Sequence, residues 1–261
     1  MIQFNLNRFA KLAKWSLTND MKYHVKSFWQ MLVILALFFM FFTMVFRTEG
    51  NDLQGYQMCA FGVISIFVFT LLIIGPSLMF YSMEGKHDMQ TLLMLPASNF
   101  EKYLMRYASW LILLPIYLVG FLGADLLQYV AHLVTGQGEG MFVASVVVNG
   151  LSRMWAQMPD KMHGALVHAV IPIILWLHSF YALGATFFRW RKHNWVLTTL
   201  ALMVLVGLQA WIFPYSVSAE EAPTTDFILN DVLCAFWTVL NFWLSYRLFC
   251  RRQVIGKLVN L

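Results

Sequence analysis

The 261-residue sequence contains little charge. Only 12% of its residues are Asp, Glu, Lys or Arg, whereas 60% are hydrophobic. A soluble domain of this length needs more polar surface than that. The apolar residues are grouped in blocks of about 20, the length at which a helix crosses a bilayer. The alternating strands of about 10 residues that build membrane barrels are absent from the sequence. We therefore predict an all-α, polytopic membrane protein.

Cysteine and recognisable catalytic motifs are also scarce. Cys59, Cys234 and Cys250 form no CxxC pair, so we expect neither a disulfide framework nor structural zinc. The sequence has no GxxxxGK[ST] phosphate-binding loop, no HExxH zinc motif and no GxSxG serine elbow. We therefore expect no enzymatic activity, no catalytic residue, no metal site and no cofactor in this chain.

Six apolar blocks are long enough to cross the membrane. The first is too long for a cleavable signal peptide and is expected to be a retained span. No internal repeat is visible, so residues 1–261 are interpreted as one membrane domain. The six predicted spans are Phe28–Phe46, Met58–Tyr81, Tyr107–Val130, Ala165–Phe188, Trp195–Pro214 and Phe227–Phe249.

The basic residues predict the orientation. With six spans the two termini share one side, and of the 18 Lys and Arg only Arg47, Arg153 and Lys161 fall on the other side. Because basic residues stay inside, both termini are predicted to be cytoplasmic, in an inner membrane, with the acidic stretch SAEEAPTTD outside. The net charge of +5 fits a ring of basic residues on the cytoplasmic side that faces anionic lipid headgroups (the cytoplasmic collar). It does not indicate a nucleic-acid surface.

Two segments outside the spans have their own patterns. Residues 1–20 have the spacing of an amphipathic helix on the inner leaflet, serving either as a simple anchor or as a brace for a cytoplasmic partner. Residues 131–164 form a long external loop. Its MFVASVVV stretch is too short to span, so it is interfacial or re-entrant, between the hinge-like sequences GQGEG and MPDKMHG.

The cytoplasmic loop of residues 82–106 has the strongest local pattern. KHDMQTLLML can form a short helix, which Pro96 ends because proline lacks the amide hydrogen. Ser98 and Glu101 have the spacing of a capping box that starts the next helix. That helix continues through Lys102 and Arg106 into the third span. The loop is either a rigid elbow (residues 85–106) that transmits force or an ordinary hairpin turn.

The order of these elements resembles the six-span permeases of bacterial ATP-binding-cassette (ABC) exporters of the second exporter type. The stretch TLLMLPASNFEKYLMRY, residues 91–107, is similar to the LPAS…EK…R pattern of their cytoplasmic loop. The resemblance implies that residues 85–95 are a coupling helix docked on an ABC ATPase, beside a connecting helix at the N-terminus. The implied docking residues are Glu84, His87, Asp88, Met89, Gln90, Leu92 and Leu93.

The resemblance also implies a function. The chain would move a hydrophobic or amphipathic substrate by alternating access, with ATP and Mg²⁺ held by the partner ATPase and a second permease copy or homologous permease completing the pathway. One departure is that the bulky outer loop follows the third span and not the fifth. The alternatives are a non-transporting assembly or sensor subunit that recruits a cytoplasmic partner, and a membrane enzyme with an unrecognised site.

Polar residues within the spans are candidates for function because burying them in lipid is costly. Asp125, Gln128 and His132 share one helical face. They are part of a substrate path or a proton-sensitive gate or, preferably, an interhelical hydrogen-bond cluster or an interface-dipping helix end. His168 and His178 point in different directions and do not form a metal pair. Asn241 and Ser245 are expected to bond to a neighbouring helix.

Overall fold

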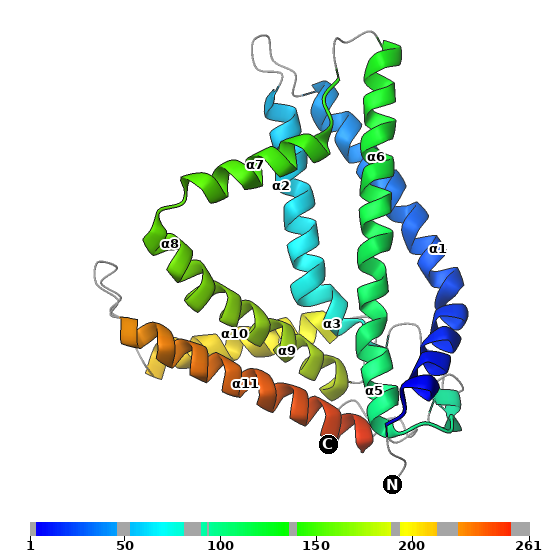
Figure 1. Cartoon of the computed structure of the whole chain (residues 1–261), viewed down its shortest axis with the longest axis vertical. Coiled ribbons are helices and arrows are strands. Elements are labelled where there is room, and N and C mark those ends of the chain that lie inside the picture. The colour runs from blue at the N-terminus through cyan, green and yellow to red at the C-terminus, as the bar shows by residue number, and fades with distance from the viewer. Residues whose placement is uncertain are drawn as a thin grey trace. The chain divides into compact units, whose positions relative to one another are not determined.

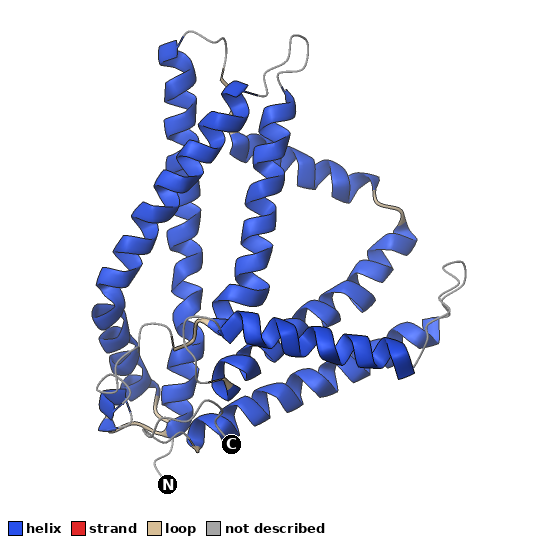
Figure 2. Cartoon of the chain, turned by 180° about the vertical axis from the view of Figure 1, so that it is seen from behind, coloured by secondary structure: helices blue, strands red, loops and turns tan. Residues whose placement is uncertain are grey.

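The computed structural model describes residues 4–45, 53–80, 90–92, 94–135, 140–188, 194–212 and 224–251. Every regular element in these ranges is a helix, as Figure 2 shows. The predicted all-α class is therefore confirmed.

The helices follow one another as labelled in Figure 1. Two short segments, η1 and η3, are π-helical, and η2 is a 3₁₀ turn. The elements are α1 Leu6–Val45, α2 Leu53–Phe69, η1 Thr70–Ile74, α3 Gly75–Ser77, α5 Asn99–Ala108, η2 Ser109–Ile112, α6 Leu113–Thr135, α7 Val143–Gln157, α8 Asp160–Ala165, η3 Leu166–Val170, α9 Ile171–Phe187, α10 Asn194–Ile212 and α11 Thr224–Cys250.

Within the described residues, five helical runs are long and apolar enough to cross a membrane. They are Leu6–Met44, Leu53–Ser77, Asn99–Thr135, Met162–Phe187 and Ile228–Cys250, and each contains most of a predicted span. The predicted span Trp195–Pro214 overlaps α10. The apolar run described there, Asn194–Leu208, is shorter than the five candidate crossings. A multi-pass membrane protein is therefore supported, and the sixth crossing stays a prediction.

Helix α1 has no break between its amphipathic start and its apolar end. Its 40 residues make a rod of about 60 Å, twice the thickness of the hydrocarbon core. Neither Gly nor Pro occurs between Leu6 and Val45, so nothing in the backbone interrupts the hydrogen-bond ladder. The amphipathic helix that we predicted at residues 1–20 is therefore not a separate element in the described part; its residues begin the first long helix.

The chain packs as two compact units. Unit 1 comprises residues 1–16, 70–110 and 159–261, and unit 2 comprises residues 17–69 and 111–158. Each unit has its own buried apolar cluster. This division describes packing, and the single membrane domain that we inferred from the sequence stays a prediction.

Unit 1 is built around α9, which packs along α11 and α10. Gly184 allows the close approach to α10, because a Cβ at this position would overlap the Thr198 side chain. In unit 2, α2 packs against α7. There Gly55 has a similar role, since a Cβ on it would lie 2.5 Å from the Phe42 carbonyl oxygen of α1.

Candidate functional site

The elbow begins with a short helical turn that ends at proline. Residues 90–92 are helical, and the Leu95 amide donates to the carbonyl oxygens of Thr91 and Leu92 at 3.2 and 3.4 Å. Pro96 follows, and the Ala97 amide turns back to the Leu95 carbonyl at 2.8 Å. The predicted stop at Pro96 is confirmed.

Helix α5 starts with the capping box that the sequence predicts. Ser98 is extended, with φ −67° and ψ 153°. Its hydroxyl accepts from the Glu101 amide at 3.2 Å, and its own amide donates to Glu101 Oε2 at 2.8 Å. Two amides that a helix start leaves without a backbone partner are thereby satisfied.

The Glu101 carboxylate also binds the start of α1. Arg8 makes a bidentate contact, Nη2 to Oε1 at 2.6 Å and Nε to Oε2 at 2.8 Å. The Asn5 amide donates to Oε1 at 2.7 Å. Every one of these partners is an N–H donor, so the geometry requires the ionised carboxylate. We call Asn5, Arg8, Ser98 and Glu101 the Glu101 clasp.

The clasp is asymmetric in its exposure. The Glu101 side chain is fully buried, whereas 32% of the Arg8 side chain is exposed. Asn5 prepares Arg8 for the contact, because its Oδ1 accepts from the Asn7 and Arg8 amides and caps α1. The clasp therefore joins two helix starts that lie more than 90 residues apart in the sequence.

One turn further along α5, the buried Arg106 makes a second set of contacts. Its Nη1 donates to Ser16 Oγ at 3.0 Å and its Nε to the Met79 carbonyl at 3.3 Å. Lys102 is buried as well, at 4% exposure. Lys102 and Arg106 thus belong to the packed interior of unit 1, although by sequence they counted among the cations of the cytoplasmic collar.

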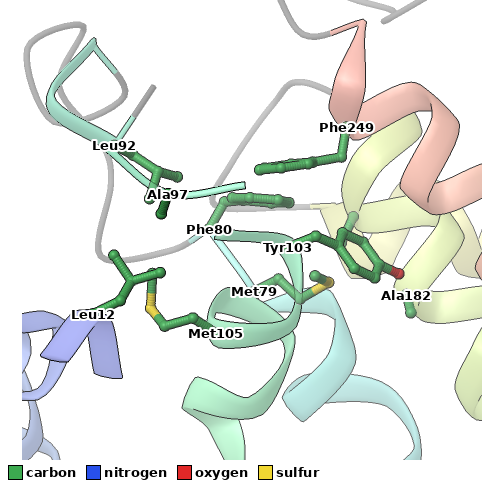
Figure 3. Close-up of a cluster of buried hydrophobic side chains, with 10 residues drawn as sticks. Leu12, Met79, Phe80, Leu92, Ala97, Tyr103, Met105, Ala182 and Phe249 are labelled. Atoms are coloured by element: carbon green, nitrogen blue, oxygen red, sulfur yellow. The ribbon is translucent and has the colours of Figure 1, made fainter. Parts of the chain in front are cut away.

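The elbow and α5 also contribute to a buried apolar cluster of unit 1 (Figure 3). Leu12 of α1 lies beside Met105 of α5, and the rings of Phe80 and Phe249 stack with centroids 5.9 Å apart. The whole cluster is Leu12, Met79, Phe80, Leu92, Ala97, Tyr103, Met105, Ala182, Ala185 and Phe249. The elbow is therefore held by burial as well as by charge.

The predicted docking residues have different outcomes. Glu84, His87, Asp88, Met89 and Leu93 lie outside the described residues. Gln90 is exposed. Leu92 is fully buried in the cluster of Figure 3, which corrects its prediction as an anchor for a partner. Met94, which sequence reasoning missed, is 84% exposed.

In unit 2, Asp125 binds the first turn of α7. Its Oδ1 accepts from the Val143 amide at 2.8 Å and its Oδ2 from the Ala144 amide at 2.9 Å. Asp125 is 1% exposed. The carboxylate therefore caps a helix that belongs to another part of the chain, and it lies where the positive end of the helix dipole favours an anion.

Gln128 and His132 complete the same face of α6. Gln128 Nε2 donates to the Tyr56 hydroxyl at 3.3 Å, and His132 Nε2 lies 2.9 Å from Thr43 Oγ1. Both side chains are at most 2% exposed. The interhelical hydrogen-bond cluster that we favoured from the sequence is confirmed, and a role in a substrate path stays a prediction.

His168 and His178, both in the predicted fourth span, have separate partners, as expected. His178 Nδ1 lies 2.8 Å from the Leu71 carbonyl and its Nε2 lies 2.6 Å from the Tyr107 hydroxyl. A carbonyl only accepts, so Nδ1 carries a proton, and when the ring is neutral Nε2 accepts from the Tyr107 hydroxyl. His168 Nδ1 lies 2.8 Å from Asp231 Oδ2.

Asn241 and Ser245 of α11 bond to a neighbouring helix as predicted. Asn241 donates to Ser179 Oγ at 3.0 Å, and Ser245 donates to the Ala182 carbonyl at 3.2 Å. Ser245 also accepts from Tyr103 and Thr186, at 3.0 and 3.1 Å. These bonds tie α5, α9 and α11 together within unit 1.

Metal ligands are not gathered in the described ranges. No group of three or more His, Cys, Asp or Glu side chains there could hold an ion. The three cysteines are free thiols. The prediction that the chain binds no metal is not tested by this observation.

Comparisons with known proteins identify no family: no family model, no curated protein and no solved structure matches this chain.

Proposed function

We propose that this chain is the permease subunit of an ABC exporter, with ATP hydrolysis carried out by a separate subunit. The support is the resemblance of the elbow sequence together with the helical, multi-pass architecture. The proposed substrate is hydrophobic or amphipathic. A second permease copy or a homologous permease supplies the other half of the pathway.

The Glu101 clasp is the observation on which the proposal rests. A loop that only connects two spans does not need a buried ion pair to the N-terminal helix. Here the charge-assisted bonds of Arg8 and Glu101 fix the helix that follows the elbow to the start of α1. Such bonds are stronger and more directional than neutral ones. The joint is therefore rigid enough to pass on a force applied at the loop.

In the proposed mechanism, closure of two nucleotide-binding subunits displaces the elbow. The clasp and the apolar cluster around it move with α5, because Glu101 and Leu92 are fully buried. Helix α5 is part of the run Asn99–Thr135, so the displacement reaches the transmembrane segment. The spans then tilt and expose the pathway to the opposite side.

The exposed residues of the elbow are the proposed contact with the ATPase. Met94 is 84% exposed and lies two residues after the buried Leu92. Met94 therefore replaces Leu92 as the apolar anchor in the proposal. Gln90, which is exposed, is a polar contact, and Asp88, outside the described residues, is kept as a polar contact from the sequence prediction. Apolar side chains of this kind are common anchors at interfaces.

Photo-crosslinking at position 94 tests this proposal. A crosslinking amino acid placed at 94 of the full-length protein in its native membrane is expected to capture a protein that carries a phosphate-binding loop. The same amino acid at 141, in the predicted external loop, is the matched control and should not capture it. Purified together, the pair is expected to lose ATPase stimulation on Met94→Asp or Asp88→Lys.

Other results would change the assignment. A captured cytoplasmic protein with no nucleotide-binding motif would favour the alternative, an assembly or sensor subunit. Capture of the same proteins from positions 94 and 141 would contradict the predicted orientation. ATPase activity that is indifferent to both charge variants, in a complex that still forms, would contradict docking through the elbow.

A further inference from the structure

Helix α7 has one apolar side and one polar side. At 100° per residue, most of its apolar side chains fall within one arc of about 140°, and most of the polar ones lie opposite, where Val146 and Ala156 are the apolar exceptions. The apolar arc contains Val143, Ala144, Val147, Val148, Leu151, Met154 and Trp155, whereas Ser145, Asn149, Ser152, Arg153 and Gln157 lie on the other side.

Only the first turns of this apolar side are covered by unit 2. Val143 is fully buried, and Val147 packs against the same cluster. The later residues of this apolar side are partly exposed: Leu151 is 45% exposed, Met154 55% and Trp155 56%. The apolar surface thus extends about two turns beyond the core that holds its beginning.

The beginning of α7 is firmly held. Asp125 accepts from the Val143 and Ala144 amides, and Phe142 stacks on Tyr129 with ring centroids 4.4 Å apart. The direction of the helix is therefore set within unit 2, and its exposed apolar half projects from a fixed base.

The chain on either side of α7 places it at the membrane surface. The runs Asn99–Thr135 and Met162–Phe187 are consecutive candidate crossings, so the segment between them returns to one face of the bilayer. Fifteen residues make about 22 Å of helix, too short to cross. Met158 and Pro159 alone separate α7 from α8, so its exposed end lies close to the point where the chain re-enters the bilayer.

We propose that α7 is an in-plane helix that binds the lipid bilayer at its external interface. Leu151, Met154 and Trp155 insert among the upper acyl chains, and Asn149 and Arg153 face the headgroups. Trp is favoured at this depth because its ring is apolar and its N–H is polar. Amphipathic helices of this type bind through the apolar area that they bury. The proposal does not depend on the exporter function.

Spin labels along the helix test this. In a full-length protein with Cys59→Ala, Cys234→Ser and Cys250→Ser, single cysteines are placed at 148, 151 and 155 on the apolar side and at 149, 152 and 153 on the polar side. The labelled proteins are reconstituted in phosphatidylethanolamine–phosphatidylglycerol liposomes. Collisions with oxygen, which enters lipid, are compared with collisions with a water-soluble nickel chelate. A label at the exposed Phe61 of α2 is the reference for lipid.

Oxygen is expected to reach 148, 151 and 155 several times more readily than the nickel chelate, with the reverse preference at 149, 152 and 153. High nickel access at all six positions would place α7 in water and overturn the proposal. Low access of both reagents at 151 and 155 would mean that protein covers the apolar side, either a second copy or another part of this chain. That result would overturn it too.

Discussion

In the described structure the Glu101 carboxylate accepts its hydrogen bonds from N–H groups of two separate segments, the start of α1 and Ser98. An ionised group out of water is tolerated only when its oxygens are satisfied in this way. Each donor has a different origin: a helix cap, a guanidinium and the amide that precedes α1. Removing the charge would leave the remaining partners facing a neutral amide.

We expect Glu101→Gln to lower stability by about 1–3 kcal/mol, since it leaves Arg8 without its anion. The effect is moderated because 32% of the Arg8 side chain is exposed. Arg8→Gln should destabilise the protein as well. The double variant should lose less unfolding free energy than the sum of the two single losses. Thermal unfolding of the four proteins in detergent gives the coupling energy. Additive losses would show that the pair is not coupled.

Asp125 offers a second test on a single side chain. Replacing it with Ala removes the acceptor for the Val143 and Ala144 amides, so these amides should exchange with deuterium faster. Mass spectrometry of the peptide that covers 141–147 measures this in nanodiscs. Ser145→Ala is the control, because that hydroxyl donates only to Phe142. Unchanged exchange in Asp125→Ala would contradict the capping role.

At the scale of helices, local patterns were predictable and distant partners were not. Ser98 and Glu101 are three residues apart, so their mutual bonds follow from spacing. Arg8 lies 93 residues from Glu101, and nothing in the spacing of either residue connects them. The Asn5 cap was a signal that could have located the start of α1 and suggested that Arg8 is held in place there.

The packing of α9 against α10 in unit 1 depends on Gly184. In Gly184→Ala, the new methyl group would overlap the Thr198 side chain, so α9 and α10 must separate or shift. We expect a loss of about 1–3 kcal/mol, typical of overpacking. Gly207→Ala is the matched control, since a Cβ there would meet nothing within 4 Å. Unfolding midpoints in detergent compare them, and equal midpoints would show that the close approach is not needed.

At the scale of the molecule, composition predicted five of the membrane-crossing candidates, because apolar length is a local property. The continuity of α1 was missed: the change from polar to apolar composition near residue 28 was taken as a boundary, although the backbone has no helix breaker there. The division into two units was equally inaccessible, since it depends on which helices pack together.

The number of crossings can be tested by labelling. If α10 crosses, a cysteine at 221 in the acidic stretch should react with an impermeant maleimide from outside, and a cysteine at 257 should not. Both are placed in a background with Cys59→Ala, Cys234→Ser and Cys250→Ser. If α10 does not cross, position 221 lies in the cytoplasm and position 257 lies outside. Labelling at 257 from outside would therefore contradict six spans with a cytoplasmic C-terminus.

Buried Leu92 and exposed Met94 stand two positions apart, and this has a practical consequence for genetics. A screen for variants that lose assembly will recover two kinds of hit from this short stretch. Changes at 92 should reduce the amount of protein in the cell, through degradation of misfolded chains. Changes at 94 should leave abundance normal. Sorting hits by abundance first is therefore necessary before any of them is taken as a contact.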